Sequence, residues 1–196
     1  MKNRTSDLGI AISILIASAA ILFSACGAAP EPVRVLRIPE EGRMPQAVND
    51  KNGLTHLMYF RGAMSGGDLY YSRWNTEEPT WTAPIRINSE PRTSIGMGPM
   101  DGGDMALTTG NTATPHIHAV WFQNNPLRLF YTRSAEGGDN FETQRTLVEI
   151  EDKIIEARPS ITTDGRDQIF IAWHGAPTVS YTHLRAHETD SYLVCR

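Results

Sequence analysis

Several residues in this sequence have side chains that could bind a metal. Residues 97–104 form a Gly- and Asp-rich stretch that could offer carboxylates to calcium, but they lack a recognised loop spacing. His116 and His118 alternate with apolar residues, which places both on one face of a strand. No further ligands accompany the two histidines, so we expect them to be packed or surface residues. We expect residues 97–104 to connect two strands, and we expect the chain to hold no metal or cofactor.

The last residues form another possible cluster, but their composition differs abruptly from the rest of the chain. Residues 179–196 read VSYTHLRAHETDSYLVCR. The side chains there that otherwise suggest a metal or nucleophile site belong to His183, His187, Glu188 and Cys195. The stretch resembles a conceptual translation of the transposase adapter used in sequencing libraries, followed by its flanking primer. We therefore predict an adapter-derived tail without function, which interrupts the reading frame after about Thr178.

The N-terminus has the layout of a secretory signal. Lys2 and Arg4 give a basic start, and an apolar run over residues 8–23 follows. The alternative is a single membrane-spanning helix, but such a helix needs roughly 20 apolar residues and this run is shorter. Small residues directly before Cys26 resemble the bacterial lipobox, in which the cysteine is acylated and becomes the mature N-terminus. The resemblance implies a membrane anchor through lipid on Cys26.

These features divide the chain into four parts. We predict a lipoprotein signal peptide at residues 1–25, a lipid-anchored tether at 26–38, a folded domain at 39–178 and the adapter-derived tail at 179–196. The expected location is the bacterial cell envelope, at the outer membrane if the cell is Gram-negative. With the tail set aside, Cys26 is the only cysteine, so we expect no disulfide. The net charge of −4 disfavours nucleic acid as a partner.

Internal repeats indicate the architecture of residues 39–178. The sequence DLYYSR at residues 68–73 recurs as RLFYTR at residues 128–133. An aromatic-ended strand precedes each copy, HLMYF at 56–60 and IHAVWF at 117–122, and IFIAW at 169–173 is a third. Each unit reads as four short strands separated by turns, which is the content of a propeller blade. We therefore predict an all-β fold, a partial β-propeller of about two blades plus the start of a third.

A turn motif adds a resemblance to a known family. The sequence SAEGGDNF at residues 134–141 resembles the Asp box of bacterial neuraminidase repeats, with Ser134, Gly138 and Phe141 matching and Glu136 close to the usual Asp. In this motif the side chains hold a hairpin turn, so its role is structural. Together with the repeats, the motif makes residues 43–176 resemble the sialidase-like six-bladed β-propeller superfamily.

The resemblance implies candidate catalytic residues. Sialidases bind the carboxylate of their substrate with arginines, and the first of these arginines lies before a Pro at the start of the first blade. Arg37 and Arg43 both lie before a Pro, and Arg43 has the better spacing to the next strand. Asp68 lies where the family carries its acid, and Arg61 precedes it. The alternative for Arg43 is a structural role in the repeat, because Arg158 also precedes a Pro. The alternative for Asp68 is a turn carboxylate that takes part in a cross-strand ion pair.

Two functions follow from this resemblance. The first is a surface-anchored, non-catalytic module that binds glycans or surface proteins, because propellers are widely used without chemistry. The second is the N-terminal part of an exo-α-sialidase-type glycoside hydrolase. The late Tyr and Glu of sialidases have no counterparts in this chain, so we expect the chain as it stands to be inactive and favour the first function.

Overall fold

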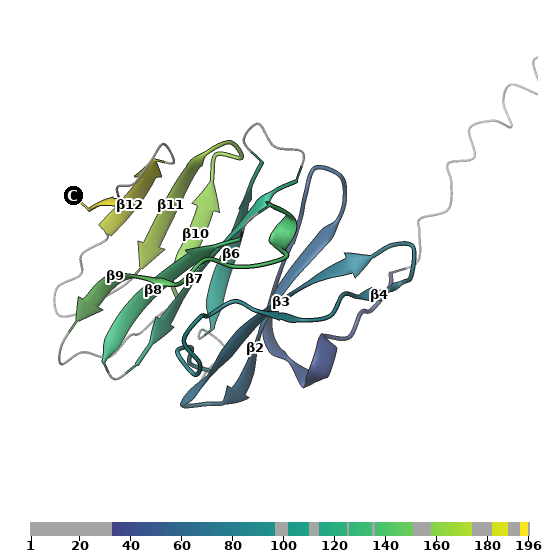
Figure 1. The fold of residues 1–196 in the computed structure, drawn as a ribbon, viewed down its shortest axis with the longest axis horizontal. Coiled ribbons are helices and arrows are strands. Elements are labelled where there is room, and N and C mark those ends of the chain that lie inside the picture. Colours follow the sequence, from purple (N-terminus) through teal and green to yellow (C-terminus); the bar gives the residue numbers. More distant parts are fainter. Residues whose placement is uncertain are drawn as a thin grey trace, which may run out of the picture. The chain divides into compact units, whose positions relative to one another are not determined.

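Short apolar stretches bounded by turn residues form the strands of this protein. A computed structural model describes residues 33–96, 102–109, 114–124, 126–134, 136–150, 158–173, 182–187 and 193–195. Within them the fold is all-β, as predicted, with three antiparallel sheets and two short 3-10 turns, η2 (Pro39–Glu41) and η3 (Glu136–Gly138) (Figure 1). None of the described helical segments is long and apolar enough to cross a membrane. The predicted signal peptide and Cys26 lie outside the described residues.

The three sheets follow one another along the chain. Sheet 1 contains β1 (Arg43–Asn49), β2 (Thr55–Ala63), β3 (Gly66–Asn75), β4 (Thr80–Trp81) and β5 (Ile85–Arg86), and both β4 and β5 pair with β3. Sheet 2 contains β6 (Gly103–Thr108), β7 (His116–Gln123), β8 (Leu127–Arg133) and β9 (Arg145–Ile150). Sheet 3 contains β10 (Ser160–Thr163), β11 (Gln168–Trp173), β12 (Thr182–His187) and β13 (Leu193–Cys195). In sheets 2 and 3 the strands pair in chain order, and in sheet 1 they do so from β1 to β4, while β5 returns to pair with β3.

Sheet 3 extends further than the sequence analysis expects. The expected domain ends at about Thr178, but β12 and β13 belong to residues 179–196 and pair with β11 and with each other. Without these two strands the sheet would consist of β10 and β11, the start of a third repeat. The adapter origin of residues 179–196 stays a prediction, because strand pairing does not test where a sequence comes from.

Alternation along the strands lets sheet 2 contribute to two cores. Ile117, Ala119 and Trp121 of β7 join the core shared with sheet 1, and this cluster includes Met58 and Tyr71. The next residues in alternation, Val120 and Phe122, join the core shared with sheet 3. Successive strand side chains point to opposite faces, so both faces of sheet 2 are covered. Figure 1 shows the sheets arranged in chain order, with sheet 2 in the middle.

A segment that precedes the first strand covers the other side of sheet 1. The indole of Trp81 donates a 2.8 Å hydrogen bond to the carbonyl of Arg37, and Gly42 lies so close to the Tyr59 ring that a Cβ there would clash. The Tyr59 ring is fully buried. The compact unit accordingly begins at Arg37, within the tether predicted over residues 26–38.

Candidate functional site

The candidate catalytic residues lie at one end of sheet 1. Arg43 is the first residue of β1 and pairs with Phe60 near the end of β2. Arg61 comes next on β2 and is in register with Asp68 near the start of β3. Antiparallel pairing therefore brings all three positions to the same end of the sheet, as a shared site requires.

Both arginines make contacts within sheet 1 and the segment before it. Arg43 donates a 2.6 Å hydrogen bond from Nη2 to the carbonyl of Gly62, and its guanidinium lies 5.5 Å from the centre of the Phe60 ring. Arg61 forms an ion pair with Glu40 and lies 5.1 Å from the centre of the Tyr70 ring. These contacts hold the start of β1 and η2 against the sheet.

Asp68 lies near the start of β3, and its carboxylate is held by a neighbouring loop. Its Oδ1 accepts hydrogen bonds from the Asn88 side chain at 2.7 Å and from the Arg92 backbone at 2.6 Å. Asn88 is fully buried and accepts the backbone N–H of Leu69, so Asp68 completes a network that folds residues 88–93 onto β3. The alternative expectation of an ion pair between Asp68 and Arg61 is wrong, because Arg61 pairs with Glu40 instead.

The residues that resemble an Asp box form a tight turn after β8, which we call the Asp-box turn. The Ser134 hydroxyl accepts the backbone N–H of Ile117 at 2.9 Å, and Ser134 bridges Phe141 across the turn. Glu136 lies in η3, followed by Gly137 and Gly138 with φ angles of 74° and 82°, a left-handed conformation that glycine adopts without strain. These placements support the structural role that the resemblance implies.

This turn of sheet 2 packs on sheet 1. A Cβ on Gly138 would lie 2.5 Å from the Tyr71 ring, and Phe141 meets the same ring edge-on at 5.6 Å between centres. Arg73 of β3 donates hydrogen bonds to the carbonyl of Gly137 and to the Asp139 carboxylate, both at 2.7 Å. The Asp-box turn is therefore an inter-sheet clasp, which the motif itself does not reveal.

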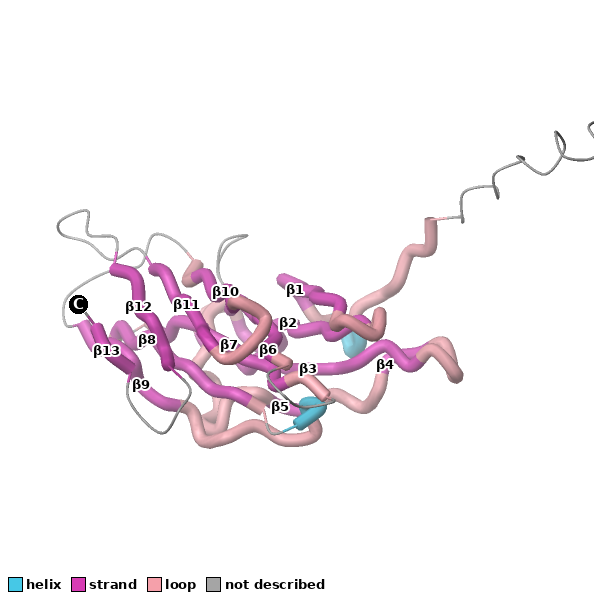
Figure 2. Tube along the Cα trace, turned by 90° about the horizontal axis from the view of Figure 1, so that it is seen from above, coloured by secondary structure: helices cyan, strands magenta, loops and turns pink. Residues whose placement is uncertain are grey.

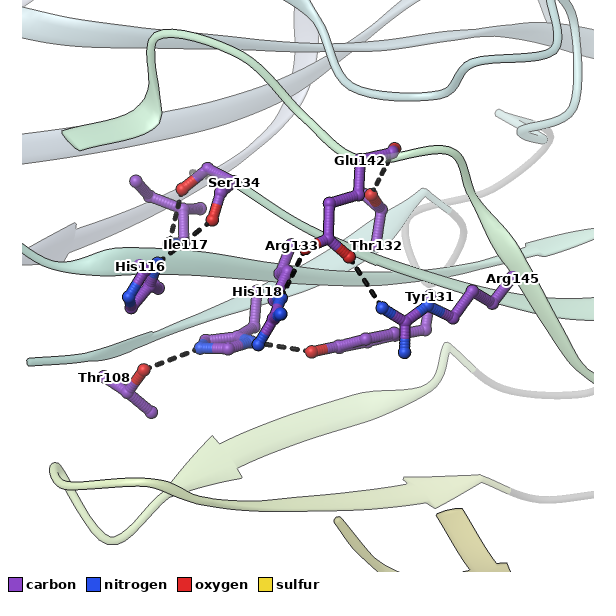
Figure 3. A network of polar contacts seen from close by, with 10 residues as sticks. All are labelled: Thr108, His116, Ile117, His118, Tyr131, Thr132, Arg133, Ser134, Glu142 and Arg145. Atoms are coloured by element: carbon purple, nitrogen blue, oxygen red, sulfur yellow. Dashed lines mark hydrogen bonds and ion pairs between the residues drawn. The ribbon is translucent and has the colours of Figure 1, made fainter. Parts of the chain in front are cut away.

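A buried polar network runs through sheet 2 (Figure 3). His118 is fully buried; its Nδ1 lies 2.8 Å from the Tyr131 hydroxyl and its Nε2 lies 2.7 Å from the Thr108 hydroxyl. Burial, with smaller contributions from the nearby His116 and Arg133, lowers the pKa of His118 to about 3. His118 is thus a neutral core residue, in line with the expected packing role.

Sheet 1 contains the same network with one change. His56 is buried, and its Nδ1 lies 2.6 Å from the Tyr71 hydroxyl. Its Nε2 lies 3.6 Å from the Asp50 carboxylate, which takes the place of Thr108. Sequence reasoning missed this pair of networks, although His and Tyr recur at matching positions of the two repeats. In the described part of the chain, no three His, Cys, Asp or Glu side chains group as a metal site requires.

The first strands of the three sheets surround a hollow of about 470 Å³. It is lined at the ends of β1, β6 and β10 by Val48, Asn49, Asp50, Lys51, Met105, Ala106, Leu107, Thr109, Ile161, Thr162, Thr163 and Gly165. These three strands contact one another in the order β1, β6, β10 (Figure 2). The hollow lies at the opposite end of β1 from Arg43, so it is separate from the candidate catalytic residues.

Comparison with known proteins found no relative of this chain among protein families or curated proteins. No protein-family model matches the sequence, and no curated protein is significantly similar to it.

Proposed function

We propose that this protein is a lipid-anchored bacterial surface module whose sheets are blades of a sialidase-like β-propeller and which binds glycans or surface proteins without catalysis. One observation carries the proposal: three antiparallel sheets, each containing a copy of the repeated aromatic strand, stack in chain order, with their first strands adjacent around a hollow. A propeller is built in this way, with its blades arranged around a central channel.

The stacking supports the propeller part of the proposal. Sheet 1 shares one core with sheet 2, and sheet 2 shares a second core with sheet 3. The first strands are tied as well, because the Asp104 carboxylate accepts the backbone N–H of Ile161 and the Thr163 hydroxyl donates to the carbonyl of Leu107. Each sheet therefore meets the next through its face and through its first strand.

The contacts of the candidate catalytic residues favour binding over catalysis. Arg43 and Arg61 are engaged by Gly62 and Glu40, and Asp68 accepts two hydrogen bonds from the loop over residues 88–93. A carboxylate-gripping arginine needs donors directed at the substrate, and a general acid needs access to the leaving group. The second candidate, the N-terminal part of an exo-α-sialidase, is favoured by one observation: all three residues share one end of sheet 1.

The proposal is tested with the full chain, expressed in a bacterial host and extracted in mild detergent. We expect it to bind a subset of glycans on an array and to leave a fluorogenic sialoside intact. If the chain hydrolyses the sialoside and the Asp68→Asn variant does not, the protein is an enzyme of the exo-α-sialidase type and the proposed non-catalytic function is wrong. A chain that binds neither glycans nor cell-surface proteins would contradict the proposed function altogether.

The anchor is tested separately. We expect the wild-type chain to incorporate labelled palmitate and to fractionate with membranes, and the Cys26→Ser variant to lose the label. Cys195→Ser is the matched control, because it removes the other cysteine of the chain and leaves the lipobox unchanged. Labelling that persists in Cys26→Ser would contradict the lipid anchor.

A further inference from the structure

We propose that the hollow at the ends of β1, β6 and β10 is a binding site for one neutral sugar residue. The inference rests on the proposed function and locates its ligand. The hollow has a volume of about 470 Å³, within the size range of small-molecule sites. It lies beside the turns that follow β1 and β10, at the other end of the first strand from the candidate catalytic residues.

One part of the lining is apolar. Of the lining residues, Met105, Ala106 and Ile161 are buried, and Val48 and Leu107 are partly buried. Such a wall suits the C–H face of a sugar ring, which is removed from water when it packs against aliphatic side chains. A ligand without an apolar face would leave the partly exposed Val48 and Leu107 in contact with water.

The polar part of the lining offers hydrogen-bond donors. Lys51 and Thr162 are exposed, and the side chain of neither makes a hydrogen bond or ion pair with another residue in the described part of the chain. Asn49 uses its carbonyl oxygen to accept the Thr55 hydroxyl, which leaves its amide N–H groups for a ligand. These three side chains come from β1, the turn after it and β10.

A carboxylate stands next to these donors. Asp50 accepts the backbone N–H groups of Asn52 and Leu54 with Oδ1, while Oδ2 lies 3.6 Å from His56. The Nε2 atom of His56 is buried and has no hydrogen-bond partner. Asp50 and its neighbour Lys51 carry opposite charges, so a ligand in the hollow meets little net charge from this pair. The Asp50 side chain is only 3% exposed, so the hydroxyl groups of a neutral ligand would accept from the neighbouring donors without placing a charge beside this carboxylate.

Titration calorimetry of the detergent-extracted full chain tests this site. The probes are the methyl glycosides of glucose, galactose and mannose, with methyl glucuronide as the acidic comparison. We expect one neutral glycoside to bind, and Thr162→Val or Lys51→Met to weaken it about three- to tenfold, the loss of one hydrogen bond. Thr146→Val is the matched control, an exposed strand threonine of β9 outside the hollow.

Each other outcome overturns a different statement. Tighter binding of methyl glucuronide, abolished in Lys51→Met, would replace the neutral sugar with an acidic one. Binding that Thr162→Val and Lys51→Met leave unchanged would place the glycan elsewhere and overturn the site, while the binding function stands. No binding to these probes or to any arrayed glycan would overturn both the site and glycan recognition.

Discussion

Sheets 1 and 2 contain the same buried His–Tyr pair, and they differ in the residue on the far side of the imidazole. In sheet 1 the partner of His56 is the Asp50 carboxylate at 3.6 Å. In sheet 2 the partner of His118 is the Thr108 hydroxyl at 2.7 Å. The rings stack in both, with centroids 5.9 Å apart for His56 and Tyr71 and 6.1 Å apart for His118 and Tyr131.

This difference separates burial from charge. Burial lowers the pKa of both histidines, because an imidazolium loses its hydration in the core. In sheet 1 the Asp50 carboxylate opposes that effect, since a negative charge stabilises the protonated ring. In sheet 2 no carboxylate opposes it, and the neighbouring His116 and Arg133 act in the same direction as burial. We therefore expect sheet 2 to be the more acid-sensitive half of the pair.

The largest predicted effect is acid destabilisation through His118. Its pKa is about 3 in the folded state and about 6.5 unfolded, so between these values only the unfolded chain takes up the proton. The free energy of unfolding then falls as the pH decreases through this window, by about 3 kcal/mol between pH 7.5 and pH 4.5. Urea denaturation at several pH values measures this slope.

Matched variants assign the slope to one sheet. His118→Gln is expected to flatten it more than His56→Gln does, because Asp50 already offsets part of the shift in sheet 1. If either variant fails to fold, the ring-proton NMR titration of the wild-type chain gives the same information. A His118 resonance that titrates near its ordinary pKa would contradict the comparison.

Exchanging the partner residues is expected to have the next largest effect. Asp50→Thr gives sheet 1 the partner found in sheet 2, and we expect it to cost about 2 kcal/mol because two backbone N–H groups lose a charged acceptor. The reciprocal Thr108→Asp is expected to raise the pKa of His118, since it places a carboxylate beside Nε2. A pKa of His118 that stays unchanged in a folded Thr108→Asp would show that burial alone controls it.

Removing the tyrosine hydroxyls tests what the two sheets share. Tyr71→Phe and Tyr131→Phe each leave one buried histidine nitrogen without its partner. We expect each substitution to lower the free energy of unfolding by about 1–2 kcal/mol, measured by urea denaturation. A clearly larger loss in one sheet would mean that the two hydroxyls have different roles. The two sheets would then share their strand arrangement but not the function of the His–Tyr pair.

The smallest predicted effect comes from the equivalent arginines of the two sheets. Arg73 reaches the Asp-box turn of sheet 2, whereas Arg133 forms an ion pair with Glu142 beside its own strand. Because the Asp139 carboxylate is 72% exposed, water screens its pair with Arg73, and we expect Asp139→Asn to cost less than about 1 kcal/mol in thermal unfolding. A loss above 2 kcal/mol would mean that this ion pair dominates the clasp.

The repeats allowed the strand content to be predicted from the sequence. DLYYSR and RLFYTR form β3 and β8, and HLMYF and IHAVWF lie in β2 and β7, because aromatic and β-branched residues bounded by turns favour strands. The extent of sheet 3 could not be predicted in this way. Its last two strands carry no repeat signal, and the composition of residues 179–196 argued against including them.

The candidate site was harder to predict, because contacts between distant residues decide it. The order of residues places Arg61 and Asp68 across from each other, but Glu40 takes the ion pair, and Asn88 and Arg92 bind the carboxylate. No local sequence pattern predicts these hydrogen-bond and ion-pair partners. The clasp between Arg73 and Asp139 joins residues that are 66 positions apart, beyond any motif.

The position of Gly138 above the Tyr71 ring has a consequence for synthesis on the ribosome. Sheet 1 ends at β5, but its aromatic core is sealed by Gly138 and Phe141, more than fifty residues later. A nascent chain can therefore close its first sheet only after the turn of the second has emerged from the exit tunnel. The first repeat thus depends on the one translated after it.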